Sequence, residues 1–207
     1  MQQFYIYFVN IYMQMLDKRS KEKLIIKKIL KGDNKSFETI IENYKKLVFH
    51  IVIRMITNKT DREDICQEVF IKVYQNLPEF RYKSKLSTWI SKIAYNTCLN
   101  YLTKKNVALN NNLSDNEEKW DEYLKSEISP AGVIEKRDLK NRLEWEISNL
   151  PMRHRILLNL YHLEELNYQE IGEVMNLPAG TVKSYLFRAR QYLKLKLTEK
   201  YQLEELL

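Results

Sequence analysis

Apolar residues recur at helical spacing along most of this chain, and that pattern restricts the fold more than any other feature. The clearest run begins at Phe37 and repeats every three or four residues as far as Val52, and shorter runs cover residues 21–31, 61–77 and 87–102. Such spacing places apolar side chains on one face of an α-helix. Only 4 glycines and 4 prolines occur among 207 residues, which is too few for a protein of many strands and turns. We therefore expect an all-α fold, with Ser36 and Asp61 beginning the second and third helices.

The helical pattern is interrupted once, between residues 106 and 134. This stretch holds 6 Asp and Glu against 2 Lys and Arg, together with a run of three asparagines, Pro130 and Gly132. A polar stretch of this length between periodic segments favours a flexible acidic linker. Helical spacing resumes beyond it, divided by Pro151 and Pro178. The sequence predicts two small helical domains, at residues 20–105 and 135–207, joined by a linker at 106–134.

Residues 1–19 form an N-terminal extension whose first 16 residues are rich in aromatic and apolar side chains. They have no basic leader and no small-residue cleavage site, which argues against a secretory signal. Two explanations remain: the true start lies at Met13 or Met15, which we favour, or the segment packs on the first domain. No stretch approaches the roughly 20 apolar residues that cross a bilayer. We expect a cytoplasmic protein without membrane insertion.

The two cysteines, Cys66 and Cys98, provide neither a disulfide framework nor a CxxC metal pair. We interpret them as two buried thiols in a reducing cytoplasm. The three histidines are scattered, and none lies at the spacing from a carboxylate that metal sites use. We expect no metal and no cofactor.

The formal net charge of +7 is distributed unevenly. Residues 1–105 carry 20 Lys and Arg against 10 Asp and Glu, whereas residues 135–207 carry 12 against 11. Within the second domain, residues 179–200 hold six basic residues and one acidic residue. Local positive charge attracts polyanions such as nucleic acid or an anionic membrane.

Residues 167–193 have the pattern of a helix-turn-helix. Asn167 can cap a short helix, Gly172 permits the close approach of a crossing helix, Asn176 tolerates the left-handed turn, and Pro178 cannot continue the first helix. The second helix has a stripe to bury, composed of Val182, Leu186, Ala189 and Leu193. Its other faces carry side chains able to enter the DNA major groove. An ordinary amphipathic helix with a solvated basic face is the alternative.

Residues 80–102 interleave aromatic side chains with cations. Tyr82, Trp89 and Tyr95 alternate with lysines such as Lys85 and Lys92. This arrangement suits single-stranded DNA, because bases stack on aromatics while cations neutralise phosphates. Trp89 and Tyr95 have a competing interpretation as core residues.

The segment LPMRHRILLNLYHLEELNYQEIGEVMNLPAGTVKSYLFRARQYL resembles region 4 of the sigma-70 superfamily, in particular of extracytoplasmic-function (ECF) sigma factors. DREDICQEVFIKVYQNL, at residues 61–77, resembles region 2.2. FRYKSKLSTWISKIAYNTCLNYL, at residues 80–102, resembles regions 2.3 and 2.4. Together with the linker, the resemblance covers roughly residues 20–200.

The resemblance implies a non-enzymatic sigma factor that binds the β′ and β subunits of core RNA polymerase, recognises promoter DNA and aids strand opening. Its polymerase-binding residues are expected to be Asp64, Gln67, Glu68 and Ile71. Its minus-10 contacts are expected to be Lys83, Ser84, Lys85, Ser87, Trp89, Lys92, Asn96 and Asn100. Its minus-35 contacts are expected to be Thr181, Lys183, Ser184, Phe187, Arg188 and Arg190. An anti-sigma factor, often membrane-anchored, is an expected partner. The linker is expected to thread the polymerase cleft, and a plain disordered tether is the alternative.

Two departures from the family pattern concern the second helix. Lys183 and Tyr185 stand where relatives often have arginine, and lysine lacks the bidentate fork that reads guanine. Two other functions remain open on the residues alone. One is a stand-alone helix-turn-helix regulator that binds operators as a dimer. The other is a small metal-dependent enzyme using Asp61, Asp64 and Glu68.

Overall fold

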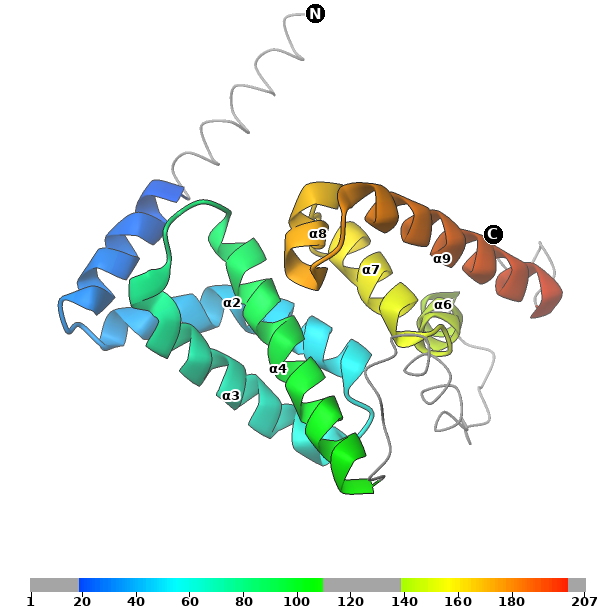
Figure 1. The fold of residues 1–207 in the computed structure, drawn as a ribbon, viewed down its shortest axis with the longest axis horizontal. Helices are drawn as coiled ribbons and strands as arrows, with labels where there is room; N and C mark the ends of the chain where they lie inside the picture. Colours follow the sequence, from blue (N-terminus) through cyan, green and yellow to red (C-terminus); the bar gives the residue numbers. More distant parts are fainter. Residues whose placement is uncertain (1–18, 110–138, 201–207) are drawn as a thin grey trace, which may run out of the picture.

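The computed structural model describes residues 19–109 and 139–200, and all regular structure in these two ranges is helical (Figure 1). The expected all-α fold is confirmed. A helix over residues 19–30 is followed by α2 Lys35–Met55, α3 Lys59–Asn76, the short 3-10 helix η1 Leu77–Glu79, α4 Leu86–Leu109, α6 Leu139–Ser148, α7 Met152–His162, α8 Tyr168–Met175 and α9 Ala179–Lys200. The predicted N-terminal extension lies outside the described residues apart from residue 19. The predicted linker also lies outside them apart from residues 106–109, which form the end of α4.

Helices α2, α3 and α4 pack around one apolar core. Ile65, Val69 and Val73 follow one another at intervals of four on α3, and all three are buried. Burial of such a stripe stabilises a helix mainly through tertiary packing rather than through its own propensity. Cys98 of α4 is fully enclosed in this core, whereas Cys66 of α3 is half-buried and both thiols are free.

The two expected helix starts differ from the structure by one to two residues. Helix α2 begins at Lys35, and the Ser36 hydroxyl donates a 2.7 Å hydrogen bond to Asp33 instead of capping the helix. Helix α3 begins at Lys59, and the side chain of Asn58 caps it by accepting a 3.0 Å hydrogen bond from the Thr60 amide. Ser and Asp are favoured in a first turn as well as at an N-cap, so their presence alone leaves the boundary uncertain by a residue or two.

Helices α6 to α9 form the second group. The predicted stripe of α9 faces inward: Val182, Leu186 and Ala189 are buried, and Leu193 is partly buried against the core. Helix α7 is buried along most of its length because it lies between α8 and α9 on one side and α2 on the other. This packing leaves the opposite face of α9 open to solvent (Figure 1).

The two groups contact each other, α4 against α8 and α2 against α7 (Figure 1). Two ion pairs and one hydrogen bond of a histidine span the contact among the described residues. Arg54 Nη2 lies 2.5 Å from Glu144 Oε2, His50 Nδ1 lies 2.8 Å from Glu164 Oε1, and Lys85 Nζ lies 2.9 Å from Glu170 Oε1. The contact therefore combines these polar pairs with apolar packing, because the buried hydrophobic residues of both groups belong to one cluster.

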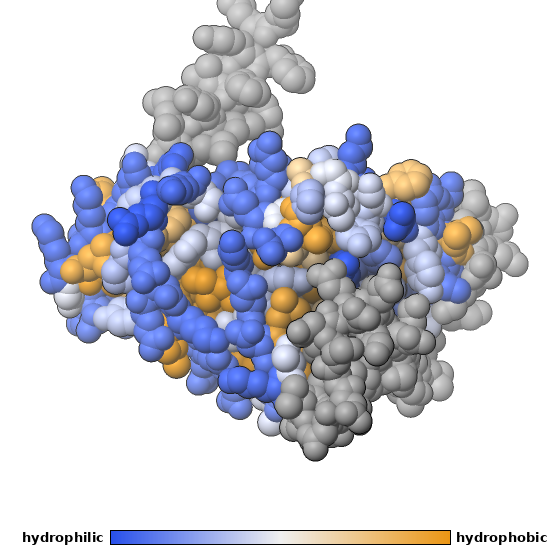
Figure 2. All heavy atoms as spheres, in the orientation of Figure 1, coloured by the Kyte–Doolittle hydropathy of each residue, from blue (hydrophilic) through white to orange (hydrophobic). Residues whose placement is uncertain are grey.

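The outer surface is mainly hydrophilic on the face shown in Figure 2, with apolar residues visible only in smaller areas. Across residues 19–109 and 139–200, no helix combines the length and the apolar character that a bilayer crossing requires.

Candidate nucleic-acid interface

The turn between α8 and α9 is built as the sequence predicts. The Asn167 side chain accepts hydrogen bonds from the amides of Gln169 at 2.9 Å and Glu170 at 3.0 Å, and Glu170 Oε2 accepts one from the Asn167 amide at 2.9 Å. This reciprocal capping box fixes the start of α8. Asn176 ends the helix in the left-handed conformation, with φ 55° and ψ 47°. Both expected roles are confirmed.

Gly172 allows the turn to close on α8. A Cβ placed at this position would lie 2.5 Å from the carbonyl oxygen of Leu177, and the Leu177 amide donates a 2.9 Å hydrogen bond to the Gly172 carbonyl. The expected close approach is present, but it comes from the backbone of the turn rather than from a crossing helix. No side chain fits there, so the tightness of the turn depends on glycine.

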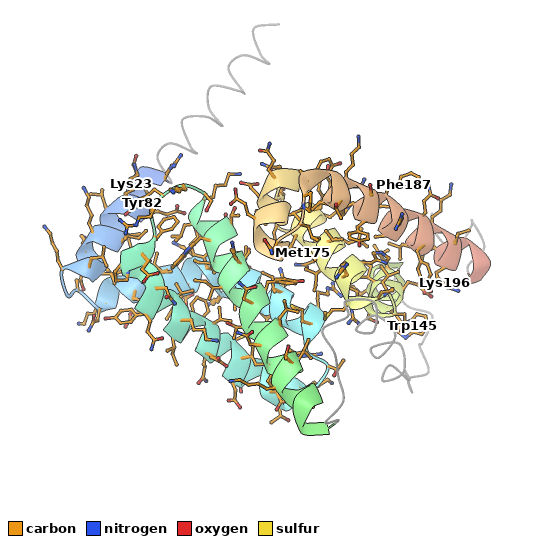
Figure 3. The ribbon with its side chains drawn as sticks, in the orientation of Figure 1. Lys23, Tyr82, Trp145, Met175, Phe187 and Lys196 are labelled. Carbon is orange, nitrogen blue, oxygen red and sulfur yellow. The ribbon has the colours of Figure 1, made fainter. Side chains whose placement is uncertain are left out.

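The first half of α9 presents most of the expected minus-35 residues to solvent. Lys183, Ser184, Phe187 and Arg188 are exposed, while Thr181 is half-buried in the first turn. Phe187 is 62% exposed, which is unusual for so large an apolar side chain, and Figure 3 shows it on the outer side of α9. Cations, a hydroxyl and an aromatic ring on one open helix face are the groups that contact bases and phosphates in a major groove.

Arg190 differs from its neighbours because its guanidinium is held against α7. It lies 4.9 Å from the centroid of the Tyr161 ring, and its Nη2 is 3.3 Å from His162 Nε2. Burial and the nearby Arg190 charge both lower the pKa of His162. The neutral imidazole can therefore accept a hydrogen bond from Arg190, which directs this cation along α7.

Tyr185 is also directed toward α7. Its hydroxyl accepts a 3.1 Å hydrogen bond from Arg153 Nη1, and the Arg153 guanidinium lies 5.3 Å from the ring centroid. The residue that departs from the usual family pattern thus stabilises the packing of α9 on α7.

An aromatic cluster supports the loop between η1 and α4. Phe80 lies 4.8 Å from Tyr82 and 5.1 Å from Trp89, measured between ring centroids. Tyr82 has a left-handed backbone with φ 57°, and its carbonyl accepts a 3.0 Å hydrogen bond from Arg19 Nη2. Lys23 Nζ lies 5.4 Å from the centroid of the Tyr82 ring. Figure 3 shows the two labelled residues next to each other. The helix over residues 19–30 therefore braces the loop.

Several expected minus-10 residues share one side of α4. Trp89, Lys92, Asn96 and Asn100 follow at intervals of three and four; the last three are exposed, and Trp89 is half-buried against Phe80. Lys83 in the preceding loop is exposed, and Ser84 and Ser87 are half-buried. Lys85 is ion-paired with Glu170 of α8. The loop and α4 together form a continuous basic and polar strip.

Helix α3 presents the expected polymerase-binding residues on its outer face. Asp64, Gln67, Glu68 and Ile71 are exposed, and Glu68 Oε1 lies 2.6 Å from Lys72 Nζ. Tyr74, three residues beyond Ile71, is also exposed, but its hydroxyl donates a 2.8 Å hydrogen bond to Asn34 and its ring packs 5.0 Å from that of Phe37.

Two of the three carboxylates of the alternative metal site, Asp61 and Glu68, have other partners. Asp61 accepts a short hydrogen bond from the Tyr101 hydroxyl, and Glu68 pairs with Lys72. Within the described parts of the chain, no group of three or more His, Cys, Asp or Glu residues is arranged to hold a metal ion.

Comparison with known proteins gives two family matches, to "Sigma-70 region 2" over residues 40–107 and to "Sigma-70, region 4" over residues 141–193. Over 178 residues the chain is 32% identical to the ECF RNA polymerase sigma factor SigW of Bacillus subtilis (strain 168), which covers 84% of this chain and 95% of that protein. The chain belongs to the ECF sigma factors.

A second relative of this sigma factor is the ECF RNA polymerase sigma-E factor of Haemophilus influenzae (strain ATCC 51907 / DSM 11121 / KW20 / Rd), 32% identical over 180 residues, covering 85% of this chain and 95% of that protein. Among solved structures, CnrH in complex with the cytosolic domain of CnrY matches with a TM-score of 0.60 and 15% identity, covering 86% of this chain and 97% of that chain. RpoE of Bartonella quintana, in complex with the anti-sigma factor NepR, matches with a TM-score of 0.58 and 20% identity, covering 81% of this chain and 99% of that chain. These structures support the fold of the ECF sigma factor, and the resemblance inferred from the sequence is confirmed.

Proposed function

We propose that this ECF sigma factor binds core RNA polymerase through α3 and directs it to promoters, with α9 recognising the minus-35 element and the loop before α4 recognising the minus-10 element. The observation that carries the proposal is the presence, in one chain, of an open recognition helix and a separate basic and aromatic strip. The protein aids strand opening and itself catalyses no reaction. It acts in the cytoplasm, where core polymerase is located.

For the minus-35 element, we propose base contacts from the N-terminal half of α9, which enters a major groove first. Arg188 can pair bidentately with the acceptor edge of guanine, whereas Lys183 supplies a single point charge. Ser184 and Phe187 add a hydroxyl and an apolar contact. Thr181 and Arg190 lie beside this group and are proposed to contact the DNA backbone.

For the minus-10 element, we propose that an unpaired base is captured by residues 83–88, which comprise the end of the loop and the first turn of α4. Lys83, Lys85 and Lys92 would neutralise phosphates, and Trp89 would offer an aromatic ring face for stacking. Asn96 and Asn100 lie farther along the same side of α4. Unstacking a base costs a few kcal/mol, which these fitted contacts must offset.

For polymerase binding, we propose that the face formed by Asp64, Gln67, Glu68 and Ile71 contacts a basic helix of the β′ subunit. Exposed carboxylates complement a basic partner, and Ile71 supplies apolar area at 56% exposure. The acidic linker would then enter the polymerase cleft. An anti-sigma factor is a further proposed partner, since a sigma factor of similar fold was solved with one.

The decisive test is transcription by purified core polymerase with this chain on a randomised promoter library. We expect transcripts that start from templates sharing two spaced elements, and co-elution of the chain with core polymerase. A stand-alone regulator would instead bind duplex operators without polymerase. Absence of both co-elution and promoter-dependent transcripts would contradict the proposal.

A further inference from the structure

We propose that the groove between α2 and α3 binds a fatty acid, with the aliphatic chain on the aromatic lining of the groove and the carboxylate among the cations at its rim. The bound lipid would obstruct the docking of core polymerase on the neighbouring face of α3. The binding site stands on the groove alone, whereas the obstruction rests on the proposed function of α3.

The groove has the size of a small-molecule site. Its volume is about 740 Å³. Sites for small organic ligands usually measure roughly 300–1,000 Å³. Phe49 of α2, together with Cys66 and Phe70 of α3, supplies the apolar lining. Phe49 is 49% exposed, so an aliphatic chain in the groove would remove aromatic surface from water.

Positive charge dominates the rim of the groove. Four cations and one carboxylate line it, namely Lys45, Lys46, Lys59, Arg62 and Glu63. Lys45 Nζ lies 2.5 Å from Glu42 Oε2, whereas the ion pairs between described residues include neither Lys46 nor Lys59. A concave surface lined mainly by cations concentrates anions. The rim therefore favours a ligand with a negative headgroup.

The guanidinium of Arg62 is oriented before any ligand binds. Its Nε donates a 2.8 Å hydrogen bond to the carbonyl of Ile56, and its Nη2 donates a 3.3 Å hydrogen bond to the carbonyl of Thr57. Both acceptors are neutral, so they hold the cation without cancelling its charge. The donors that remain can pair with a carboxylate, and a preorganised partner lowers the entropy cost of binding.

The lining and the rim together favour a fatty acid over other anions. Inorganic phosphate would use the cations but leave the rings of Phe49 and Phe70 uncovered. A base of single-stranded DNA could stack on one ring, yet its polar edges would need hydrogen-bond partners that two phenyl rings and the Cys66 thiol do not offer. An aliphatic chain has no such need and can follow a groove between two helices.

The groove borders the proposed polymerase-binding face of α3. Glu63 and Phe70 line the groove, and the residues that follow them, Asp64 and Ile71, lie on the exposed face. Because successive helical residues are rotated by about 100°, the two surfaces meet along α3. A lipid in the groove would place its bulk next to Ile71 and obstruct a partner helix there.

The test uses Cys66 as a reporter inside the groove. The full chain is treated with iodoacetamide, with and without laurate below its micelle-forming concentration, and each modified cysteine is followed by mass spectrometry. Burial and the charge of Glu63 raise the pKa of Cys66, so the reaction is run at mildly alkaline pH to supply thiolate. We expect alkylation of Cys66 to slow by about tenfold at a laurate concentration ten times the dissociation constant.

Cys98 provides the internal control for denaturation. It is enclosed in the core, so its alkylation rate should not change when laurate occupies the groove. Faster alkylation of both cysteines would show that laurate unfolds the protein, and it would overturn the site.

Three other probes separate the contributions of the chain and the charge. Dodecanol has the chain without the charge, butyrate has the charge without the chain, and oligothymidylate is a single-stranded nucleic acid. We expect each to protect Cys66 less than laurate at equal concentration. Equal protection by butyrate would indicate a plain anion site, equal protection by dodecanol a plain apolar site, and equal or stronger protection by oligothymidylate a nucleic-acid site. Any of these results would overturn the proposal.

Removal of rim charge tests the site independently. The double variant Lys46→Gln, Lys59→Gln should weaken laurate binding in calorimetric titration by up to about fivefold per cation, the range of an exposed ion pair. Lys27→Gln, Lys35→Gln loses the same charge from exposed positions outside the groove and should bind like the wild type. Circular dichroism melting establishes that both variants are folded. Equal losses would show that net charge alone attracts the lipid, against the proposal.

Titration of labelled core polymerase separates the lipid site from the proposed function. We expect laurate to weaken the association of the wild type with core polymerase and to affect the Lys46→Gln, Lys59→Gln variant less. If the wild type binds no core polymerase but laurate protects Cys66, the proposed function fails and the lipid site stands. If it binds core polymerase while laurate leaves Cys66 unprotected, only the lipid site fails. Unchanged polymerase affinity at saturating laurate would overturn the obstruction alone.

Discussion

At the residue scale, Gly172 illustrates how a single missing Cβ determines a turn. Its role as a close-approach residue could be predicted from its place before Asn176 and Pro178. The identity of the approaching group could not, because the Leu177 carbonyl is brought there by the left-handed conformation of Asn176. Local pattern indicates where space is short, whereas the backbone path decides which atom occupies it.

Gly172→Ala should destabilise the protein despite the better helix propensity of alanine. The new Cβ would lie 2.5 Å from a backbone carbonyl, so the turn must shift, and we expect a loss of about 1–3 kcal/mol in the free energy of unfolding. Urea unfolding measures it. Gly180→Ala is the control, since a Cβ there meets no atom within 4 Å, and it should be neutral or stabilise by up to about 1 kcal/mol. Equal effects at both positions would refute the steric explanation.

Arg190→Ala should raise the pKa of His162 toward its ordinary value. Burial and the charge of Arg190 both lower that pKa, and the substitution removes the second cause. Because the folded state favours the neutral imidazole, its contribution to stability is present above the unfolded pKa and is lost as the pH falls through the folded pKa. NMR titration of the His162 ring protons provides the measurement. Arg188→Ala, two residues away on the exposed face, should leave the titration unchanged.

At the element scale, α9 has two faces with different tasks. The buried face stabilises the fold, and the exposed face carries the residues proposed to recognise DNA. The buried stripe was predictable from spacing, because the period of a helix determines which residues share a side. The different orientations of Arg188 and Arg190 were not predictable, since they depend on Tyr161 and His162 of another helix. Helix starts were predictable only to within two residues, as Ser36 and Asp61 show.

Phe187→Ala and Leu186→Ala should affect different properties, DNA binding and stability, although the residues are adjacent. Phe187 is 62% exposed and Leu186 is 1% exposed. We expect Leu186→Ala to cost about 2–5 kcal/mol of stability by creating a cavity. Phe187→Ala should leave stability within about 0.5 kcal/mol, as for other surface substitutions, and should weaken promoter-specific binding by the holoenzyme. Urea unfolding and a promoter-binding assay test the pair; a stable Leu186→Ala or a fully active Phe187→Ala would contradict the assignment of faces.

Ile71→Ala should weaken binding to core polymerase without affecting the fold. Removing exposed apolar area at the centre of an interface costs on the order of 1–2 kcal/mol, or about tenfold in affinity. Leu30→Ala is the matched control, because Leu30 is 51% exposed and Ile71 is 56% exposed. Titration of labelled core polymerase gives the two affinities. The α3 interface would be ruled out by equal losses for the two variants.

At the scale of the whole molecule, the contact between the two groups of helices could not be predicted from the sequence. Lys85 and Glu170 lie far apart in the sequence, on either side of residues 106–134, and neither belongs to a pattern that indicates the other. Segregation of charge predicted a basic strip and a basic recognition helix, but periodicity carries no information about which surfaces pair. The two-domain, all-helical character followed from local spacing; the packing of α4 on α8 follows from shape and charge in three dimensions.

Glu144→Gln should weaken the whole-molecule contact. Glu144 compensates Arg54, which lies near the buried Arg155; burial first, and then the Arg54 charge, lowers the pKa of Arg155 to about 10. Without Glu144 the two cations repel each other, and we expect a loss of about 1–3 kcal/mol in the free energy of unfolding. The exposed pair of Lys45 and Glu42 serves as the control, and Glu42→Gln should cost less than about 1 kcal/mol. Urea unfolding measures both variants. Equal losses in the free energy of unfolding would contradict the prediction.

The two cysteines allow the opening of the first group of helices to be followed by thiol modification. Cys66 is half-buried, while Cys98 is enclosed in the core, where burial raises the pKa of its thiol to about 12. The thiolate is the nucleophile that attacks a thiol reagent, so alkylation of Cys98 waits for α4 to separate from α2 and α3, whereas Cys66 reacts earlier. The interval between the first and the second modification therefore records how often this core opens, and the two native thiols are enough to report it.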